Sequence, residues 1–296
     1  MRSMPRTRRH ALPRSTEALP IGELVDAIAG ILRAGGIEEP RREARIIVAE
    51  ATGFDRARQL SAGDQTVESG PALALARRRA AREPMAYLLG RRAFWGHDFA
   101  VGPGVLVPRP ETETLIEVAL EALPDRTLPL NILDLGTGTG CLLLTLLSLY
   151  PNAFGVGIDR SQAALAYAAA NRSALGLEAR CGLVCGSWLA PFGGSFDLIV
   201  ANPPYIAPDE SRDAETRHEP ELALLADVDG LDAYRAIAAP AFAACHSGAL
   251  LITEIGATQA VVVTEVLRSV GFGEINCRRD LAGRPRAIVA RRTAAG

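Results

Sequence analysis

Two consecutive prolines, Pro203 and Pro204, closely follow an apolar run from Phe196 to Ala201. The run predicts a buried strand. Because proline lacks the amide hydrogen that a sheet requires, the strand must end before Pro203 and the chain must turn there. A stiff loop at the carboxyl end of a parallel strand is where open α/β sheets bind ligands. The sequence therefore predicts a parallel α/β sheet with a ligand site at Asn202 to Tyr205.

The side chains of this loop suit a planar NH₂ group. Asn202 offers a side-chain carbonyl, Pro203 offers a backbone carbonyl, and Tyr205 offers a flat face. Two fixed acceptors localise electron density on an amide or ring-amino nitrogen and stabilise the positive charge that grows there during attack on an electrophile. Asn-Pro and Pro-Pro are also common in turns that only end a strand, so the upstream sequence has to decide between the two interpretations.

A glycine-rich turn lies upstream. Apolar residues 130–134 predict a strand and Cys141 to Leu147 predict a helix, with five loop residues between them that we expect to bind a cofactor: Gly136, Thr137, Gly138, Thr139 and Gly140. A second predicted strand, 153–158, ends at Asp159, about twenty residues after the loop, where nucleotide-binding folds carry a ribose-binding carboxylate. Loop, carboxylate and Asn-Pro-Pro-Tyr in this order predict a nucleotide-type cofactor site.

The glycine spacing separates two cofactor classes. A dinucleotide-binding loop requires G-x-G-x-x-G, but Cys141 stands at the position of the third glycine. The pattern that begins at Asp134 instead resembles the first motif of class I S-adenosylmethionine-dependent methyltransferases. In that family the loop passes the methionine end of the cofactor and the later acid holds the ribose hydroxyls. A NAD-dependent dehydrogenase is the weaker alternative.

Composition describes an ordinary globular protein. The chain of 296 residues is long enough for two modest domains, and a net charge of -2 gives no overall drive toward nucleic acid. No apolar run approaches the roughly 20 residues of a membrane span. Five cysteines without a C-x-x-C pair argue against a metal or disulfide framework. We expect a cytoplasmic, monomeric protein that binds neither metal, membrane nor nucleic acid stably.

The chain divides into four predicted parts. Residues 1–20 are expected to form a flexible extension, 21–92 a helical N-terminal domain, 93–110 a β-hairpin linker, and 111–296 the α/β domain. Hydrophobic spacing predicts helices from Ile21 to Gly35, from Pro40 to Gly53 and from Ala72 to Ala81. Seven strands are predicted in the α/β domain, the last two forming an antiparallel pair because their connection is too short for a helix: 130–134, 153–158, 181–185, 196–201, 248–254, 273–277 and 286–291.

At this point the chain resembles a known family, the bacterial HemK/PrmC-type protein-(glutamine-N5) methyltransferases that modify peptide chain release factors. The resemblance covers roughly Ile21 to Arg291. Besides the glycine loop and Asn-Pro-Pro-Tyr, its landmarks are Glu83-Pro84-Met85-Ala86-Tyr87, Phe94-Trp95-Gly96, Pro108-Arg109-Pro110-Glu111-Thr112-Glu113 and Glu219-Pro220.

The resemblance implies a class I methyltransferase (Rossmann-like) fold with a mostly parallel seven-stranded sheet. It also implies S-adenosyl-L-methionine as the cofactor and a release-factor glutamine, in a GGQ motif, as the substrate recognised with help from the helical domain. Trp188 matches the family's tryptophan beside the adenine, although Ser187 replaces the usual acid before it. Asn202 is expected to contact both cofactor and substrate. Asn202, Pro203, Pro204 and Tyr205 are expected to bind the substrate glutamine, with Asn202, Pro203 and Tyr205 as the catalytic residues.

The sequence leaves other functions open. Asn-Pro-Pro-Tyr also occurs in adenine and guanine amino methyltransferases of nucleic acids, and a sister branch methylates a glutamine of a ribosomal protein. A non-catalytic adaptor on the same fold is a further alternative. For Arg109, Glu111 and Glu113, helix capping and surface salt bridges are the favoured interpretation.

Overall fold

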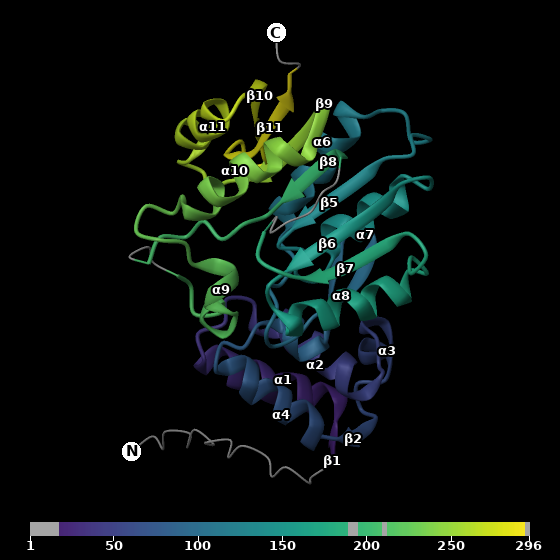
Figure 1. Ribbon diagram of the computed structural model, residues 1–296. Coiled ribbons are helices and arrows are strands. Elements are labelled where there is room, and N and C mark those ends of the chain that lie inside the picture. Colours follow the sequence, from purple (N-terminus) through teal and green to yellow (C-terminus); the bar gives the residue numbers. More distant parts are fainter. Residues whose placement is uncertain (1–17, 189–194, 209–211, 294–296) are drawn as a thin grey trace, which may run out of the picture. The chain divides into compact units, whose positions relative to one another are not determined.

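The computed structural model describes residues 18–188, 195–208 and 212–293, and the chain divides into two compact units with the boundary between Leu89 and Gly90 (Figure 1). We describe each unit by itself. Among the described residues, no helix combines the length and the hydrophobicity that crossing a bilayer requires.

The first unit is mainly helical. Its elements are β1 (Ala18–Pro20), α1 (Ile21–Ala34), α2 (Pro40–Thr52), α3 (Arg56–Ser61), β2 (Thr66–Glu68), α4 (Gly70–Ala80) and α5 (Met85–Leu89). The α1 residues Ile21, Leu24 and Ile28 recur at helical spacing and are fully buried in one core. Gly53 has φ +72° directly after α2, so glycine ends this helix as the sequence predicts. The short antiparallel pair of β1 and β2 was not predicted.

The second unit begins with a β-hairpin that is shorter than the sequence predicts. Strands β3 (Arg91–Phe94) and β4 (His97–Ala100) pair in antiparallel register, and residues 101–109 contain no helix or strand. Trp95 and Gly96 both have positive φ, +47° and +79°. Two consecutive positive φ angles make a two-residue turn, which pairs the flanking residues at once. The hairpin therefore covers 91–100 rather than the whole of 93–110.

A seven-stranded sheet forms the centre of the second unit (Figure 1). Its order is β10-β11-β9-β8-β5-β6-β7. The strands are β5 (Asn131–Leu135), β6 (Phe154–Asp159), β7 (Cys181–Cys185), β8 (Phe196–Ala201), β9 (Cys245–Glu254), β10 (Phe272–Arg279) and β11 (Pro285–Arg292). The first five run parallel, while β11 is antiparallel to both β9 and β10. The mostly parallel sheet and its antiparallel closure confirm the predicted fold class.

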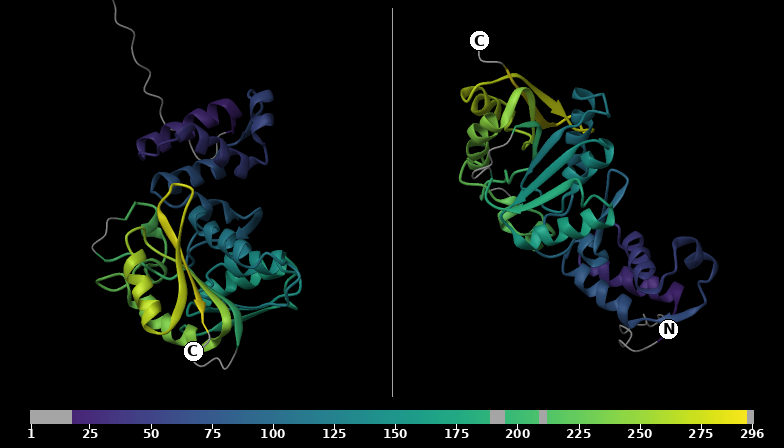
Figure 2. Two further views of the ribbon diagram at one scale, coloured as in Figure 1. Left: turned by 90° about the horizontal axis from the view of Figure 1, so that it is seen from above. Right: turned by 45° about the vertical axis from the view of Figure 1, so that its right-hand side comes forward.

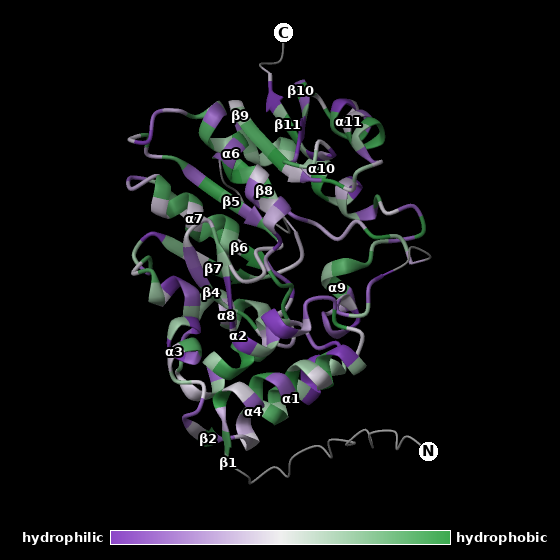
Figure 3. Cartoon of the chain, turned by 180° about the vertical axis from the view of Figure 1, so that it is seen from behind, coloured by the Kyte–Doolittle hydropathy of each residue, from purple (hydrophilic) through white to green (hydrophobic). Residues whose placement is uncertain are grey.

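Helices cover both faces of this sheet (Figure 2). One face packs against α6 (Glu113–Ala122), α7 (Cys141–Leu149) and the residues directly after α8 (Gln162–Ala174), and the other against α10 (Asp232–Ala244) and α11 (Ala260–Ser269). The alternation is visible within one strand, because Leu250 and Ile252 of β9 belong to the first core and Leu251 to the second. Hydrophobic residues run through β9 and α7 accordingly (Figure 3).

The described residues of the second unit also form three short helices: η1 (Pro110–Thr112), η2 (Thr216–His218) and α9 (Glu221–Leu224). The strand order makes β5 the neighbour of both β6 and β8. Their carboxyl ends carry the glycine loop, Asp159 and Asn202, respectively, so these three motifs meet at one edge of the sheet.

Candidate functional site

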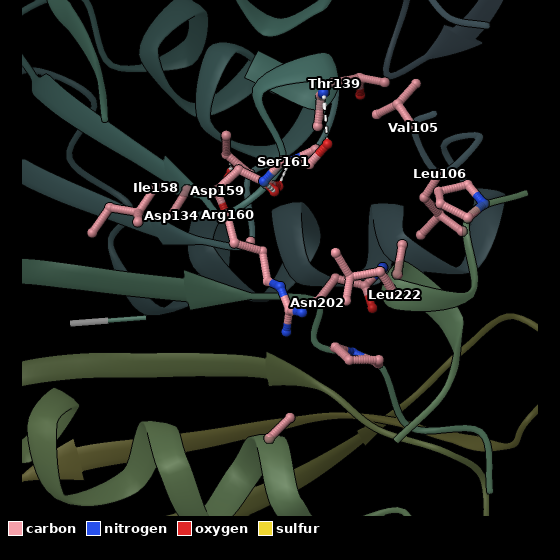
Figure 4. Close-up of a pocket in the computed structure, with 18 of the residues that line it drawn as sticks. Val105, Leu106, Asp134, Thr139, Ile158, Asp159, Arg160, Ser161, Asn202 and Leu222 are labelled. Atoms are coloured by element: carbon pink, nitrogen blue, oxygen red, sulfur yellow. Dashed lines mark hydrogen bonds between the residues drawn. The ribbon is translucent and has the colours of Figure 1, made fainter. Parts of the chain in front are cut away.

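A cavity of about 190 Å³ opens at the carboxyl edge of the sheet, and the lining residues within the described part of the chain belong to the second unit. Its walls come from the loop after β4, the glycine loop, the ends of β6 and β7, the loop after β8, and α9. Figure 4 shows Asp134, Ile158 and Asp159 on one side of this cavity and Leu106 and Leu222 on the other. Such a mixture of apolar walls with a few polar groups is typical of cofactor sites.

The glycine loop is held in left-handed backbone conformations. Gly136, Gly138 and Gly140 have φ of +76°, +56° and +80°, which side-chain-bearing residues rarely adopt. A Cβ on Gly140 would lie 2.9 Å from Cδ1 of Leu144 in the core, so this glycine is also needed for packing. At Gly138 an added Cβ would have its nearest atoms, the Gly136 carbonyl oxygen and Cγ2 of Val105, at 3.9 Å, and a backbone that carries no side chain there can approach a ligand closely.

Asp159 connects the glycine loop to the start of α8. The backbone N–H of Gly138 donates to Oδ2 of Asp159 over 2.9 Å, and that of Ser161 donates to Oδ1 over 2.8 Å. The carboxylate is half-buried and lines the cavity. It is therefore fixed in place by two backbone donors while it retains acceptor capacity toward a ligand.

Asp134 lies beneath the same loop and is 1% exposed. Its Oδ2 accepts from the hydroxyl of Thr137 over 2.7 Å, while Oδ1 has no hydrogen-bond partner in the described part of the chain. Burial and the negative charge of Asp159 together raise the pKa of Asp134 to about 7, against the effect of the Thr137 hydrogen bond. Asp134 belongs to the lining of the cavity, and an unpartnered buried oxygen is an acceptor for a cationic or N–H group of a ligand that reaches it.

Asn202 follows β8 and lines the cavity opposite the end of β5. Its Nδ2 donates to Oγ1 of Thr112 over 3.2 Å, and the Thr112 hydroxyl donates to Oε2 of Glu254 over 2.6 Å. Glu254 ends β9, the neighbour of β8 in the sheet. Burial raises the pKa of Glu254 to about 6, while the Thr112 hydrogen bond and the positive charge of Arg286 lower it.

Some of the predicted site residues line the cavity and others do not. Those that line the cavity are Gly136, Thr137, Gly138, Thr139, Asp159, Trp188, Asn202 and Pro204, whereas Gly140, Pro203 and Tyr205 lie outside the lining. The hydroxyl of Tyr205 donates to Oε1 of Glu254 over 3.3 Å, and burial raises the pKa of this tyrosine. Tyr205 also packs against the core on the α10 and α11 face of the sheet. Trp188 lies in the cavity wall with φ +47°.

Arg109 forms a largely buried ion pair, whereas a surface salt bridge was expected. Its Nη2 lies 2.5 Å from Oε1 of Glu219, whose side chain is only 1% exposed. The second oxygen of Glu219 accepts from the backbone N–H of Val107. Glu113 also differs from the expected cap of its own helix, since its carboxylate accepts from the backbone N–H of Trp95.

Sequence reasoning missed three residues that position the site. Thr112 and Glu254 hold Asn202, as described above. Asn171 of α8 is 2% exposed, and its Nδ2 donates to the carbonyl of Thr139 in the glycine loop over 2.9 Å. Asn171 and Glu254 each offered one signal, a polar residue next to an apolar run, whereas Thr112 stood among the charged residues of the 108–113 motif.

Two family models match the chain: the PrmC N-terminal domain at residues 23–90 and the methyltransferase small domain at residues 112–218. Among curated relatives, the release factor glutamine methyltransferase of Rhodospirillum rubrum is 42% identical, over 94% of this chain and 87% of its own length. The protein of the same name from Cereibacter sphaeroides is 46% identical, over 89% of this chain and 95% of its own.

Among solved structures, a T. thermophilus 16S rRNA methyltransferase in complex with AdoMet and guanosine superposes with a TM-score of 0.52 at 20% identity, over 68% of this chain and 49% of that chain. This likeness shows the methyltransferase fold. The similarity to the two curated relatives extends over nearly the whole chain and both units. The chain belongs to the family of release factor glutamine methyltransferases.

Proposed function

We propose that this protein transfers a methyl group from S-adenosyl-L-methionine to the side-chain amide nitrogen of a glutamine in peptide chain release factors, giving N5-methylglutamine and S-adenosylhomocysteine. One observation carries the proposal: a fixed amide acceptor, Asn202, lines a cofactor-type cavity in a chain whose relatives, at 42% and 46% identity, are named release factor glutamine methyltransferases.

The residues around the cavity fit the cofactor in three respects. Gly136 to Gly140 form a loop in which Gly138 carries no side chain, so that the backbone can approach the cofactor closely. Asp159 offers a fixed carboxylate to ribose hydroxyls, and the unpartnered Oδ1 of Asp134 offers an acceptor to a cationic group. Trp188 contributes an aromatic surface for the adenine. When bound, S-adenosylmethionine supplies an electrophilic methyl group.

The chain's own part in the reaction is to hold the glutamine amide. An amide nitrogen is a poor nucleophile because its lone pair is delocalised into the carbonyl. Acceptors at Asn202 Oδ1 and the Pro203 carbonyl bind its two N–H groups, aim the nitrogen and stabilise the charge that develops during transfer. No strong base is required, since the methylated nitrogen releases its proton to solvent. The flat side chain of Tyr205 is expected to pack on the bound glutamine amide.

We further propose that residues 21–92 recognise the release factor, which the match of residues 23–90 to the PrmC N-terminal domain supports. The hairpin at 91–100 and the loop up to Pro110 then link this domain to the methyltransferase domain, 111–296.

Labelled S-adenosylmethionine tests the function directly. The purified protein and labelled cofactor are incubated in separate reactions with one candidate substrate each. The candidates are a release factor, a release factor in which the acceptor glutamine is replaced by alanine, ribosomal proteins, tRNA and DNA. We expect label only in the unchanged release factor, on a glutamine located by mass spectrometry. Label in tRNA or DNA, or none in the release factor, would overturn the proposal.

A further inference from the structure

Two residues outside the predicted motif determine how Asn202 is held. Thr112 and Glu254 are 2% and 1% exposed, and they come from η1 and the end of β9. Two hydrogen bonds connect the three residues in series. Asn202 Nδ2 donates to Thr112 Oγ1 over 3.2 Å, and the Thr112 hydroxyl donates to Glu254 Oε2 over 2.6 Å.

The direction of this series follows from the number of protons available. A hydroxyl has one hydrogen to donate, and an ionised carboxylate can only accept. The Thr112 hydrogen is therefore directed to Glu254, and Thr112 Oγ1 can only accept from Asn202. Asn202 must present its NH₂ group to Thr112, which leaves Oδ1 as the acceptor that it offers to the cavity. The two ends of an amide are nearly isosteric, so shape alone would not select this orientation.

Glu254 has few neighbours that carry or can acquire charge. The hydroxyl of Tyr205 donates to its Oε1 over 3.3 Å, and Nη1 of Arg286 lies 3.7 Å from the same oxygen. Arg286 is shared with Asp280, 3.4 Å away, and Glu111 repels Glu254 from η1. Tyr234 of α10 donates to the backbone carbonyl of Glu254 and not to its carboxylate. Arg286 and the two hydroxyl donors therefore favour the ionised form, while burial and Glu111 oppose it.

We propose that Glu254, acting through Thr112, is a positioning residue that fixes the side-chain amide of Asn202 with its oxygen toward the substrate. The inference rests on the proposed function, in which that oxygen accepts from the glutamine NH₂ group. When Glu254 is protonated or replaced by glutamine, it can donate to Thr112. The Thr112 hydrogen is then free to turn toward Asn202, whose reversed amide would present N–H groups to the N–H groups of the substrate.

Kinetics of a small variant set test the proposal. Thr112→Val removes the hydroxyl and Glu254→Gln removes the acceptor-only group, so each should lower kcat about 10- to 100-fold and leave KM for the release factor within about threefold. Thr112→Ser keeps the hydroxyl and should retain kcat within about threefold. Glu117→Gln, at an exposed position of α6, is the matched control and should behave as wild type.

The pH profile supplies a signature that a purely structural role would not give. Because the pKa of Glu254 is raised to about 6, wild-type kcat should fall as the pH is lowered through this value. The fall should be absent in Glu254→Gln and Thr112→Val, in which the series is already broken. If both variants show the same fall in kcat with decreasing pH as wild type, the proposal is overturned. A wild-type kcat in Thr112→Val would also overturn it.

A measurement without cofactor or substrate separates this inference from the proposed function. The NH₂ signals of Asn202 in a ¹H–¹⁵N spectrum are assigned by their loss in Asn202→Ala. In wild type we expect them to exchange slowly with solvent, and in Thr112→Val at least about tenfold faster. Equal exchange rates overturn the positioning role even if the release factor is methylated. Slow exchange in an enzyme that does not methylate the release factor supports the positioning role and contradicts the function instead. Thermal unfolding of each variant verifies that it is folded.

Discussion

Arg109 and Glu219, 110 residues apart in the sequence, form an ion pair in which Nη2 and Oε1 are 2.5 Å apart and Glu219 is almost completely buried. Glu219 also accepts from the backbone N–H of Val107 over 2.9 Å. One carboxylate thus joins the segment before η1 to the segment before α9, and both segments contribute residues to the cavity wall.

Breaking this pair from one side should be costlier than removing it. Arg109→Ala leaves a buried carboxylate without its cation, and we expect the free energy of unfolding to fall by about 3 kcal/mol. In Arg109→Ala combined with Glu219→Gln no buried charge remains, so the loss should be smaller than the sum of the two single losses. Urea unfolding of wild type, the two single variants and the double variant gives the coupling free energy between Arg109 and Glu219. Losses of unfolding free energy that simply add would contradict the prediction.

Asn202→Ala should lower kcat by about 10²-fold or more, because it removes an acceptor that stabilises developing charge. Affinity for S-adenosylmethionine, measured by calorimetry, should change much less, since the glycine loop and Asp159 are untouched. Near-normal turnover in this variant would contradict the assigned role of the loop.

Asp159→Asn should weaken cofactor binding about tenfold or more, because an amide cannot accept from Gly138, Ser161 and a ligand hydroxyl at once. Asp197→Asn is a matched control. Asp197 also accepts from a backbone N–H, that of Asn131, but it lies near the amino end of β8, away from the cavity at the carboxyl end. Calorimetric dissociation constants that change equally in both variants would exclude a specific role for Asp159.

Two glycines of the same loop should respond differently to alanine. Both Gly138 and Gly140 have positive φ, so both variants bear the cost of a left-handed backbone. At Gly140 the new Cβ would also lie 2.9 Å from the fully buried Leu144, whereas at Gly138 the nearest atoms are 3.9 Å away. Gly140→Ala should therefore be less stable than Gly138→Ala by about 1–3 kcal/mol in urea unfolding.

Asp134 makes stability depend on pH. Its pKa is raised from 3.8 to about 7, so between these values the folded protein binds more protons than the unfolded chain. Its contribution to stability therefore falls as the pH rises through this window, and Asp134→Asn should lack the fall. Both Tm values are measured without cofactor at pH 4.5 and at pH 8, which is about one pH unit above the upper end of the window. The Tm of Asp134→Asn minus that of wild type should be larger at pH 8 than at pH 4.5. The same dependence of Tm on pH in the variant and in wild type would contradict this prediction.

Much of the fold was predictable because its signals are local. The bounds of β8 agree with the predicted 196–201, since Asn202 and the prolines after it end the strand. The start of β9 was predicted three residues late, at 248, because Cys245 to Ser247 lack an apolar run and α10 passes directly into the strand.

The candidate site was predictable only in part, because its support depends on which strands are neighbours. Thr112 stood in a motif that was interpreted through its charged residues, Arg109, Glu111 and Glu113. Glu254 is the last residue of β9, and the end of this strand was correctly predicted. Nothing in the sequence places β9 beside β8, and this neighbourhood is what brings Glu254 within reach of the Asn202 loop. Local patterns identify the groups that face a ligand, while the groups behind them emerge from the sheet order.

The hydrogen-bond series from Asn202 to Glu254 has a consequence for protein engineering. Grafting Asn-Pro-Pro-Tyr onto the end of a strand in an unrelated parallel sheet would transfer a stiff turn and an amide free to flip. A functional transplant has to include a hydroxyl and a carboxylate, contributed here by residues 90 positions before and 52 positions after the asparagine. The smallest portable unit is therefore a three-dimensional arrangement of separate segments, which no contiguous peptide can reproduce.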